Sequence, residues 1–224
     1  MRAQCLAQLA GMILQVERSH PLRVAIDGID AAGKSTLADE LAGLLQAAGH
    51  AVIRASLDGF HHPRIKRYQL GADSPVGYYQ DSFDYPTLRS ALLVPLGPGG
   101  NRDFQRAVFD FRHDAFIQVP TEQAPEHAIL LFDGIFLLRP ELYQDWDFRI
   151  FVQVSFQTAF QRALQRDLPL FGSPQVIEAR YRKRYLPAQT NYLDTVHPQQ
   201  IAEIVVDNNN LKKPGIRKNI LDIQ

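Results

Sequence analysis

The sequence predicts an α/β fold in three layers, with a five-stranded parallel sheet between two layers of helices. Five short apolar runs have the length of buried strands, and helical patterns separate several of them. The runs lack the strict apolar–polar alternation of a half-exposed strand, which favours a parallel sheet covered on both faces. The order of strands and helices along the chain favours the same fold class. The predicted strands are residues 22–26, 51–57, 128–132, 148–154 and 202–206.

Length and charge limit the kinds of protein that this chain can be. Its 224 residues suit a single domain, residues 1–224, and 24 basic side chains balance 24 acidic ones. A net charge of zero gives no electrostatic case for binding nucleic acid. No apolar run approaches the ~20 residues that span a bilayer, so we expect no membrane association. The single cysteine, Cys5, suits a reducing cytosol, so we expect a cytoplasmic protein. The sequence leaves a homo-oligomer open.

Two segments interrupt the alternation of strands and helices. Residues 59–125, rich in aromatic residues, Asp, Pro and Gly, separate the second and third predicted strands. Long loops in compact domains are more often functional or disordered than incidental, so we interpret this segment as a substrate-binding insertion. Residues 168–174 carry Pro and Gly and predict the turn of a mobile flap between two helices. We interpret residues 162–186 as a small helical lid around that turn. Surface excursions without a function are the alternative for both segments.

The strongest motif runs from Gly28 to Thr36 and reads Gly-Ile-Asp-Ala-Ala-Gly-Lys-Ser-Thr. It matches the pattern G-x-x-x-x-G-K-[ST], with a strand-like run before it and a leucine-faced helix after it. Backbone N–H groups of such a loop point at phosphates, and the following helix adds its positive end. The motif therefore predicts a P-loop NTPase fold that binds ATP and Mg²⁺. A glycine turn with an incidental lysine is the alternative.

Individual side chains of the motif receive separate roles. We expect Lys34 to neutralise the β- and γ-phosphates, Ser35 to ligate Mg²⁺ and Thr36 to contact the α-phosphate. The other nucleotide-binding residues predicted in the loop are Gly28, Ala31, Ala32 and Gly33.

Two aspartates stand at the ends of predicted strands. Because ligands of a parallel sheet bind beyond the carboxyl ends of its strands, acids there are candidates for phosphoryl-transfer chemistry. Asp133 ends the third predicted strand and is a predicted Mg²⁺ ligand beside Ser35. Asp58 ends the second, where it could face both the phosphates and the acceptor, and it is the third predicted Mg²⁺ ligand. Each could instead form a turn or a helix cap, and Asp27 could simply brace the loop that follows it.

Basic residues flank the predicted flap. Arg162 and Arg166 lie at i and i+4 on one face of the helix that leads into it. From there, planar guanidinium groups could stabilise charge on the transferring phosphoryl group. Arg180 and Arg184 form a similar pair on the return helix. An exposed helix face is the alternative for the first pair, whereas for the second pair we expect a solvated face with one or two phosphate contacts.

After residue 20 the chain resembles the phosphoribulokinase/uridine kinase family along nearly its whole length, closest to the uridine–cytidine kinases. The resemblance rests on the P-loop, Asp58-Gly59-Phe60, residues 108–113, Phe132-Asp133-Gly134-Ile135 and residues 206–209. It implies that Asp58 is a general base and that Arg162 and Arg166 begin an arginine-bearing lid. It also implies that Phe109, Phe111 and His113 belong to a segment lining a nucleoside base pocket, and that Asn208 and Asn209 approach adenine.

The chain departs from the nucleoside kinases at several candidate substrate residues. His61 stands where a nucleoside-contacting Tyr is expected, Phe109 lacks the hydroxyl of the matching Tyr, and Arg180 replaces a Gln. Residues 58–63 and 82–84 are also similar to bacterial pantothenate kinase. Phe60 and Asp84 complete the predicted substrate contacts, with core packing and a helix or turn cap as their alternatives.

Together these patterns predict an ATP-dependent small-molecule kinase that transfers the γ-phosphoryl group to a primary hydroxyl, as in the uridine and cytidine kinases. The predicted catalytic residues are Asp58, Lys34, Arg162 and Arg166. A kinase of pantothenate, a vitamin riboside or a sugar is the alternative with the same chemistry. A nucleotide-dependent regulatory switch is the alternative of another class, although the chain lacks the Asn-Lys-x-Asp string that reads guanine.

Overall fold

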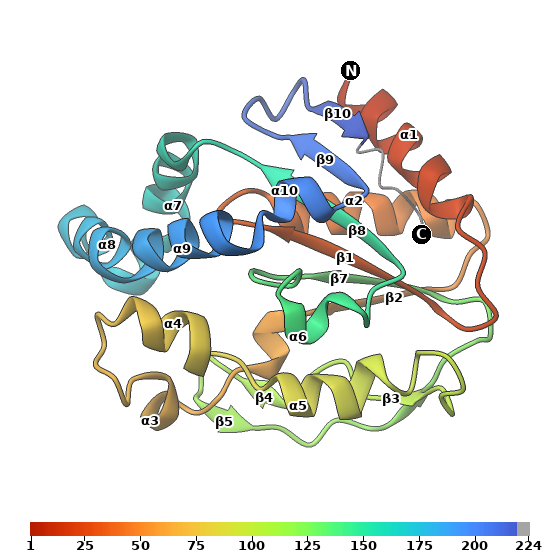
Figure 1. The fold of residues 1–224 in the computed structure, drawn as a ribbon, viewed down its shortest axis with the longest axis horizontal. Helices are drawn as coiled ribbons and strands as arrows, with labels where there is room; N and C mark the ends of the chain where they lie inside the picture. The colour runs from red at the N-terminus through yellow and green to blue at the C-terminus, as the bar shows by residue number, and fades with distance from the viewer. Residues whose placement is uncertain (219–224) are drawn as a thin grey trace.

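The computed structural model describes residues 1–218, and a mostly parallel sheet forms its centre (Figure 1). In spatial order its strands are β10 (Gly215–Lys218), β9 (Ile204–Asp207), β8 (Phe148–Gln153), β1 (Leu22–Gly28), β7 (Ile129–Asp133) and β2 (Val52–Ser56). The five predicted runs form the parallel part of the sheet, which confirms the predicted fold class. The sequence did not predict β10, an antiparallel edge strand, because its side chains are mostly exposed and form no apolar run.

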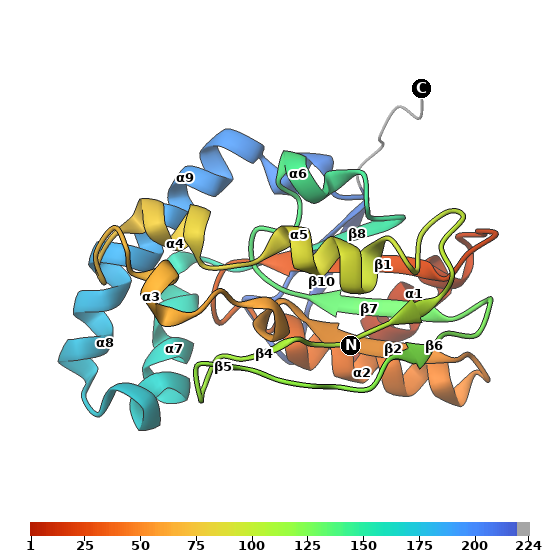
Figure 2. The same cartoon turned by 90° about the horizontal axis from the view of Figure 1, so that it is seen from below.

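The side chains of β1 alternate between two cores, one on each face of the sheet. Val24 and Ile26 pack in the core that includes α1 (Arg2–Leu14) and α2 (Lys34–Ala47). Ala25 packs in the opposite core, which includes residues of α6 (Pro140–Tyr143) and α9 (Leu186–Val196). Figure 2 shows α2 on one side of the sheet and α6 and α9 on the other. Each large apolar side chain fully buried in these cores contributes roughly 1.5–3 kcal/mol.

The segment between β2 and β7 forms a layer of short elements beside the sheet, at the bottom of Figure 1. Its helical parts are η1 (Leu57–Phe60), α3 (Arg64–Arg67), α4 (Pro75–Asp81), α5 (Tyr85–Leu88) and η2 (Arg89–Leu93). Its strands pair as β3 (Asp103–Phe104) with β6 (Glu122–Gln123), and β4 (Phe109–Asp110) with β5 (Ala115–Phe116). Because η1 follows β2 directly, this segment begins at the carboxyl edge of the sheet.

The segment predicted to be a lid, residues 162–186, comprises most of α7 (Phe156–Phe171) together with α8 (Pro174–Arg180) and η3 (Tyr181–Tyr185), and these three helices are called the lid region below. The short helix α10 (Pro198–Ile201) follows α9. Ser155 and Ser173 cap α7 and α8 by accepting a hydrogen bond from the N–H group three residues on. The predicted break over residues 168–174 is wrong in extent, since α7 continues through Pro169 and turns only at Gly172, where φ is 76°. Pro169 removes one backbone donor near the end of the helix and does not terminate it.

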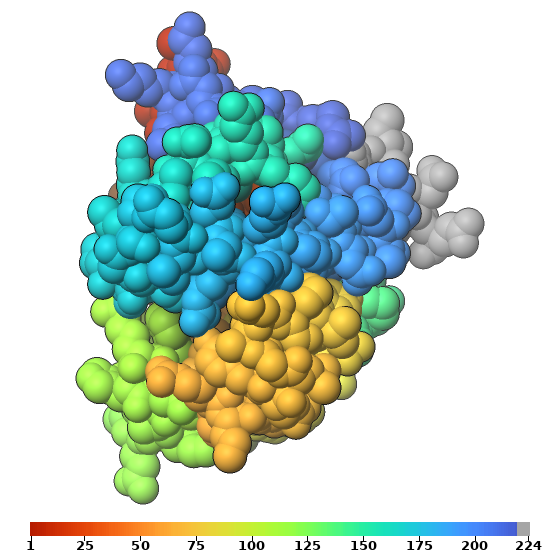
Figure 3. All heavy atoms as spheres, turned by 90° about the vertical axis from the view of Figure 1, so that its left-hand side faces the viewer, coloured from red at the N-terminus to blue at the C-terminus, as the bar shows by residue number. Residues whose placement is uncertain are grey.

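The lid region and the insertion are in contact. Figure 3 shows the blue helices of the lid region lying against the orange and yellow helices of the insertion. Arg184 of η3 is only 2% exposed and does not lie on the solvated face that the sequence favoured. Its guanidinium group donates hydrogen bonds to the carbonyl oxygens of Arg67, Ala72 and Ser74.

No helix within residues 1–218 combines the length and the apolar character that crossing a membrane requires.

Candidate active site

The P-loop connects β1 to α2, and two of its glycines have no room for a side chain. A Cβ atom on Gly28 would lie 2.5 Å from the carbonyl oxygen of Val152. Gly33 has φ 93°, and a Cβ atom there would lie 2.7 Å from the amide nitrogen of Asn208. Because α2 begins at Lys34, the N–H groups of its first turn are available to the loop. The backbone therefore has the form that the motif predicts.

Ser35 and Asp133 meet at this loop, as expected for a shared metal ion. The Ser35 hydroxyl donates a hydrogen bond of 2.5 Å to Oδ2 of Asp133. Asp133 is 3% exposed, and its Oδ1 accepts a hydrogen bond of 2.9 Å from Arg54. Nothing in the sequence singled out Arg54, since a basic residue in a strand is common on a sheet edge. Lys34 donates through Nζ to the carbonyl oxygen of Ile29 at 2.8 Å.

The Ser35–Asp133 pair fits a magnesium ion that also binds phosphate. Both side chains offer hard oxygen ligands, and Mg²⁺ usually takes one or two carboxylates together with substrate phosphates. Two protein ligands therefore suit a metal ion that arrives with a nucleotide. Across residues 1–218 there is no group of three or more His, Cys, Asp or Glu side chains that could hold a metal ion.

Asp58 lies in η1, just beyond the carboxyl end of β2. Ser56 of β2 is in register with Asp133 of β7, so the two predicted acids stand at neighbouring strand ends. Asp58 is exposed at the surface, but the protein around its carboxylate partly desolvates it. This enclosure and then the like charge of Asp133 raise the pKa of Asp58, against the opposing charges of Lys34, Arg166 and Arg112. A carboxylate with a raised pKa is a better proton acceptor.

The raised pKa of Asp58 predicts the acid limb of the activity profile. Only the ionised carboxylate accepts a proton, so turnover should fall with acid at a pKa above the ordinary aspartate value of about 3.9. The check is kcat/KM measured over roughly pH 4 to 8. The residual kcat/KM of Asp58→Asn should no longer fall with acid in this way. If the fall persists in that variant, a group other than Asp58 is responsible for it.

Asp30 is a site residue that the sequence analysis did not assign. Its Oδ2 accepts hydrogen bonds from the Tyr78 hydroxyl at 2.9 Å and from Nε2 of Gln189 at 3.0 Å. Its N–H group donates to Oε1 of Gln189 at 2.9 Å. Burial raises the pKa of Asp30, while the charges of Lys34 and Arg166 lower it. Since Tyr78 lies on α4 and Gln189 on α9, one carboxylate joins the P-loop to the insertion and to the helix after the lid.

Asp27 braces the loop, as its position before Gly28 suggested. It is fully buried, and Oδ1 accepts a hydrogen bond of 2.7 Å from the Gly28 N–H group. The Tyr192 hydroxyl of α9 donates to its other oxygen. Burial raises the pKa of Asp27, and these hydrogen bonds oppose that shift. Asp27 therefore holds the end of β1 against α9.

The turn after β9 lies beside the P-loop and contains Asn208 and Asn209. Asn208 is buried and donates through Nδ2 to the carbonyl oxygen of Ala32 at 2.8 Å. Oδ1 of Asn209 accepts a hydrogen bond of 2.9 Å from the Ser155 N–H group. Arg162 donates to the carbonyl oxygens of both asparagines, at 2.8 and 3.1 Å. Arg162 is therefore tied to the nucleotide side of the site.

Arg166 lies one turn further along α7 than Arg162. It forms an ion pair of 2.6 Å with Asp167, and its charge lowers the pKa values of Asp58 and Asp30. Arg180 lies further out in the lid region, with its guanidinium carbon 4.9 Å from the centroid of the Phe171 ring. Of these arginines, Arg166 acts most directly on the proposed centre of phosphoryl transfer.

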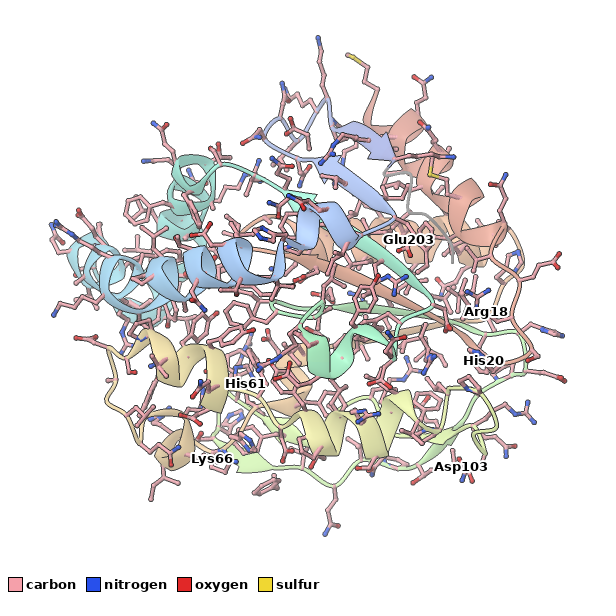
Figure 4. The ribbon with its side chains drawn as sticks, viewed as in Figure 1. Arg18, His20, His61, Lys66, Asp103 and Glu203 are labelled. Atoms are coloured by element: carbon pink, nitrogen blue, oxygen red, sulfur yellow. The ribbon has the colours of Figure 1, made fainter. Side chains whose placement is uncertain are left out.

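His61 joins an aromatic stack next to Asp58. Its ring centroid lies 4.5 Å from that of Phe83 and 5.2 Å from that of Phe111, and Nδ1 is 3.1 Å from the Asp58 carbonyl oxygen. Burial lowers the pKa of His61 to about 4, so the imidazole is neutral at physiological pH. Figure 4 labels His61 within the insertion. The stack brings together two of the predicted substrate residues, His61 and Phe111.

The remaining predicted substrate residues lie elsewhere. Phe60 is 0% exposed and packs against Phe132, and Phe109 is 2% exposed, so both rings belong to the core. Asp84 caps α5 through a hydrogen bond of 3.0 Å from the Thr87 N–H group, the cap role that the sequence also allowed. The His113 side chain is 81% exposed and pairs with Asp110 at 2.6 Å.

Comparison with known proteins gives a kinase among the curated relatives. No protein-family profile matches the chain. Uridine-cytidine kinase B of Dictyostelium discoideum is 27% identical over 176 residues, which cover 78% of this chain and 70% of that protein.

Solved structures share the fold over most of the chain. A possible uridine kinase from Bacillus stearothermophilus superposes with a TM-score of 0.72 at 23% identity, covering 92% of this chain and 99% of that one. A putative fructose transport system kinase from Silicibacter sp. TM1040 gives 0.71 at 25% identity, covering 84% and 94%. D-glycerate 3-kinase from Cryptococcus neoformans gives 0.62 at 14% identity, covering 95% and 99%. The predicted resemblance is confirmed: the chain has a uridine-cytidine kinase as a homologue and shares its fold with solved uridine kinase-like P-loop kinases.

Proposed function

We propose that this protein is an ATP-dependent small-molecule kinase that phosphorylates the primary hydroxyl of a nucleoside such as uridine or cytidine. The observation that carries the proposal is the position of Asp58, one strand away from the Ser35–Asp133 pair and at the start of the insertion. A regulatory switch has no use for a proton acceptor at that place. The homology to a uridine–cytidine kinase supports the same reaction.

In this reaction Asp58 accepts the proton of the acceptor hydroxyl as its oxygen forms a bond to the γ-phosphorus atom. The bond from that phosphorus atom to the bridging oxygen breaks, and ADP leaves. Lys34 and the N–H groups of the first turn of α2 stabilise the negative charge on the phosphates. Arg166 adds a positive charge from the lid side. Ser35 and Asp133 would hold a magnesium ion, which would supply further charge neutralisation at the phosphate oxygens.

The aromatic stack beside Asp58 supports a nucleoside as the acceptor. The rings of His61 and Phe111 are only partly buried and lie next to the proposed base, whereas Phe83 beneath His61 is a core residue. A pyrimidine nucleoside combines a planar ring, which can stack on such surfaces, with a primary hydroxyl. A neutral His61 can donate a hydrogen bond to such a ring or accept one from it. A sugar is the second candidate, because the similar Silicibacter structure is described as a putative fructose transport system kinase.

The test is ATP consumption measured with a panel of acceptors: uridine, cytidine, purine nucleosides, fructose, glycerate, pantothenate and a vitamin riboside. We expect a pyrimidine nucleoside to raise turnover above the ATP-only background, and chelation of Mg²⁺ to abolish the increase. If fructose or another acceptor alone is active, the nucleoside assignment is wrong and the phosphotransferase assignment stands. If no acceptor raises turnover, the kinase proposal itself fails.

A further inference from the structure

A cavity of about 510 Å³ lies beside the P-loop, on the side of the turn after β9. Its lining comprises Arg2, Gly33, Thr36, Arg162, Leu211 and Lys212. Gly33 and Thr36 belong to the P-loop motif, so the cavity adjoins the predicted phosphate site. Its volume lies in the range of small-molecule sites, which is about 300–1,000 Å³. The contribution of Arg2 is unexpected, because it comes from α1, which precedes the whole motif.

Arg2 is held in place through the edge of its guanidinium group. Nε donates to both carboxylate oxygens of Glu40, at 3.0 and 3.1 Å, and Nη2 donates to one of them at 2.5 Å. Nη1 donates to the carbonyl oxygen of Leu211 at 3.0 Å and to Oδ1 of Asn208 at 3.4 Å. Each nitrogen of the group thus has a protein partner, and the bonds to Glu40, Asn208 and Leu211 use four of its five N–H groups. What Arg2 can offer a ligand is the second N–H group of Nη2 and the flat face of the guanidinium group.

The charges around the cavity favour an electron-rich ligand. Arg2, Arg162 and Lys212 all line it, and Glu40 forms its ion pair with Arg2. Arg2 and Arg162 line the same cavity, and burial and then the charge of Arg2 lower the pKa of Arg162. An aromatic ring bound in this cavity can stack on a guanidinium group, since guanidinium faces stack favourably on aromatic rings.

We propose that Arg2 is a donor-specificity residue, whose guanidinium face stacks on the purine base of ATP together with Arg162. On this reading α1 is part of the nucleotide site and not only a packing helix. The inference rests on the proposed function for the presence of ATP, but it is independent of the acceptor.

The test compares ligands with and without the base. Binding of Mg·ATP and of inorganic tripolyphosphate is measured by titration calorimetry for the wild-type chain and Arg2→Ala. We expect Arg2→Ala to weaken ATP binding roughly three- to tenfold, and to leave tripolyphosphate binding unchanged. The preference for ATP over CTP should fall as well, because the smaller ring overlaps less with the guanidinium group. Gln8→Ala, an exposed position on the same helix, should change none of these values.

Two results would overturn the inference. Unchanged ATP affinity in Arg2→Ala would show that the base makes no contact with Arg2. An equal loss for ATP and tripolyphosphate would show that Arg2 acts on the phosphates or on the geometry of the loop. Arg2→Lys provides the same comparison if the alanine variant does not fold, because lysine retains the charge and lacks the flat face. Should the chain bind ATP but phosphorylate no acceptor, the proposed function fails while the assignment of Arg2 is still decided by these measurements.

Discussion

Replacing Asp58 with Asn is expected to lower turnover by about two orders of magnitude or more, the range for loss of a positioned general base. Asn keeps the size of the side chain and its hydrogen-bonding reach, but it cannot accept the proton of the acceptor hydroxyl. The substitution also removes the repulsion between Asp58 and Asp133 that contributes to the raised pKa. ATP binding and folding should therefore be retained. The measurement is kcat with the best acceptor of the panel, alongside calorimetric ATP binding and a thermal melt.

The matched control for this experiment is Asp103→Asn. Asp103 is an exposed carboxylate of the same insertion, at the opposite end of it from His61 (Figure 4). The Asp103→Asn substitution should leave kcat unchanged. A folded Asp58→Asn protein with wild-type turnover would contradict the assigned role and would leave the reaction without its proton acceptor.

Replacing Lys34 with Met is expected to lower turnover by roughly 10²–10³-fold, comparable to the removal of one preorganised donor from a transition state. Met retains the apolar stem and loses the charge that faces the transferring phosphate. Burial lowers the pKa of Lys34, whereas the charges of Asp30, Asp27 and Asp133 raise it. The lysine is thus the common counter-charge of those acids, and the variant should also melt at a lower temperature at neutral pH.

The control and the readout separate these two effects. Lys218→Met changes an exposed lysine of the edge strand β10, and we expect both turnover and melting temperature to be retained. Turnover of Lys34→Met is measured at a temperature where its melt shows it to be folded, so that lost activity reports the missing charge. Wild-type turnover in the folded variant would contradict the predicted role of the P-loop.

The parts of the fold that could be predicted depend on local signals. The parallel strands follow from apolar runs. The P-loop follows from a motif in which no residue other than glycine fits at positions 28 and 33. The site could be predicted where a residue has a fixed place relative to a strand end, as Asp58 and Asp133 have. Phe60 shows the limit of such prediction. The sequence pattern indicated an aromatic residue that contacts the substrate, but only the packed structure shows that its ring is buried in the core.

The residues that escaped prediction act through contacts that are distant in sequence. Asp30 and Gln189 are separated by 159 positions, and no local pattern signals their pairing. Arg2 donates hydrogen bonds to Glu40 and to Leu211, which are both distant from it in the sequence. No local sequence pattern signals either contact. The course of α7 beyond Pro169 was missed for another reason, because helix-breaking propensity is a local tendency that tertiary packing can override.

The hydrogen bonds that Asp30 accepts from Tyr78 and Gln189 limit any attempt to change the acceptor by replacing the whole insertion. Moving residues 59–125 from a related kinase would replace Tyr78, and with it one of the two side-chain donors to a carboxylate that burial has already desolvated. A graft that brings no hydroxyl to that position leaves the P-loop with a poorly solvated acceptor, at a cost of order 1–3 kcal/mol. The acceptor module and the ATP loop are therefore not interchangeable parts, and a transplanted insertion must bring its own donor for Asp30.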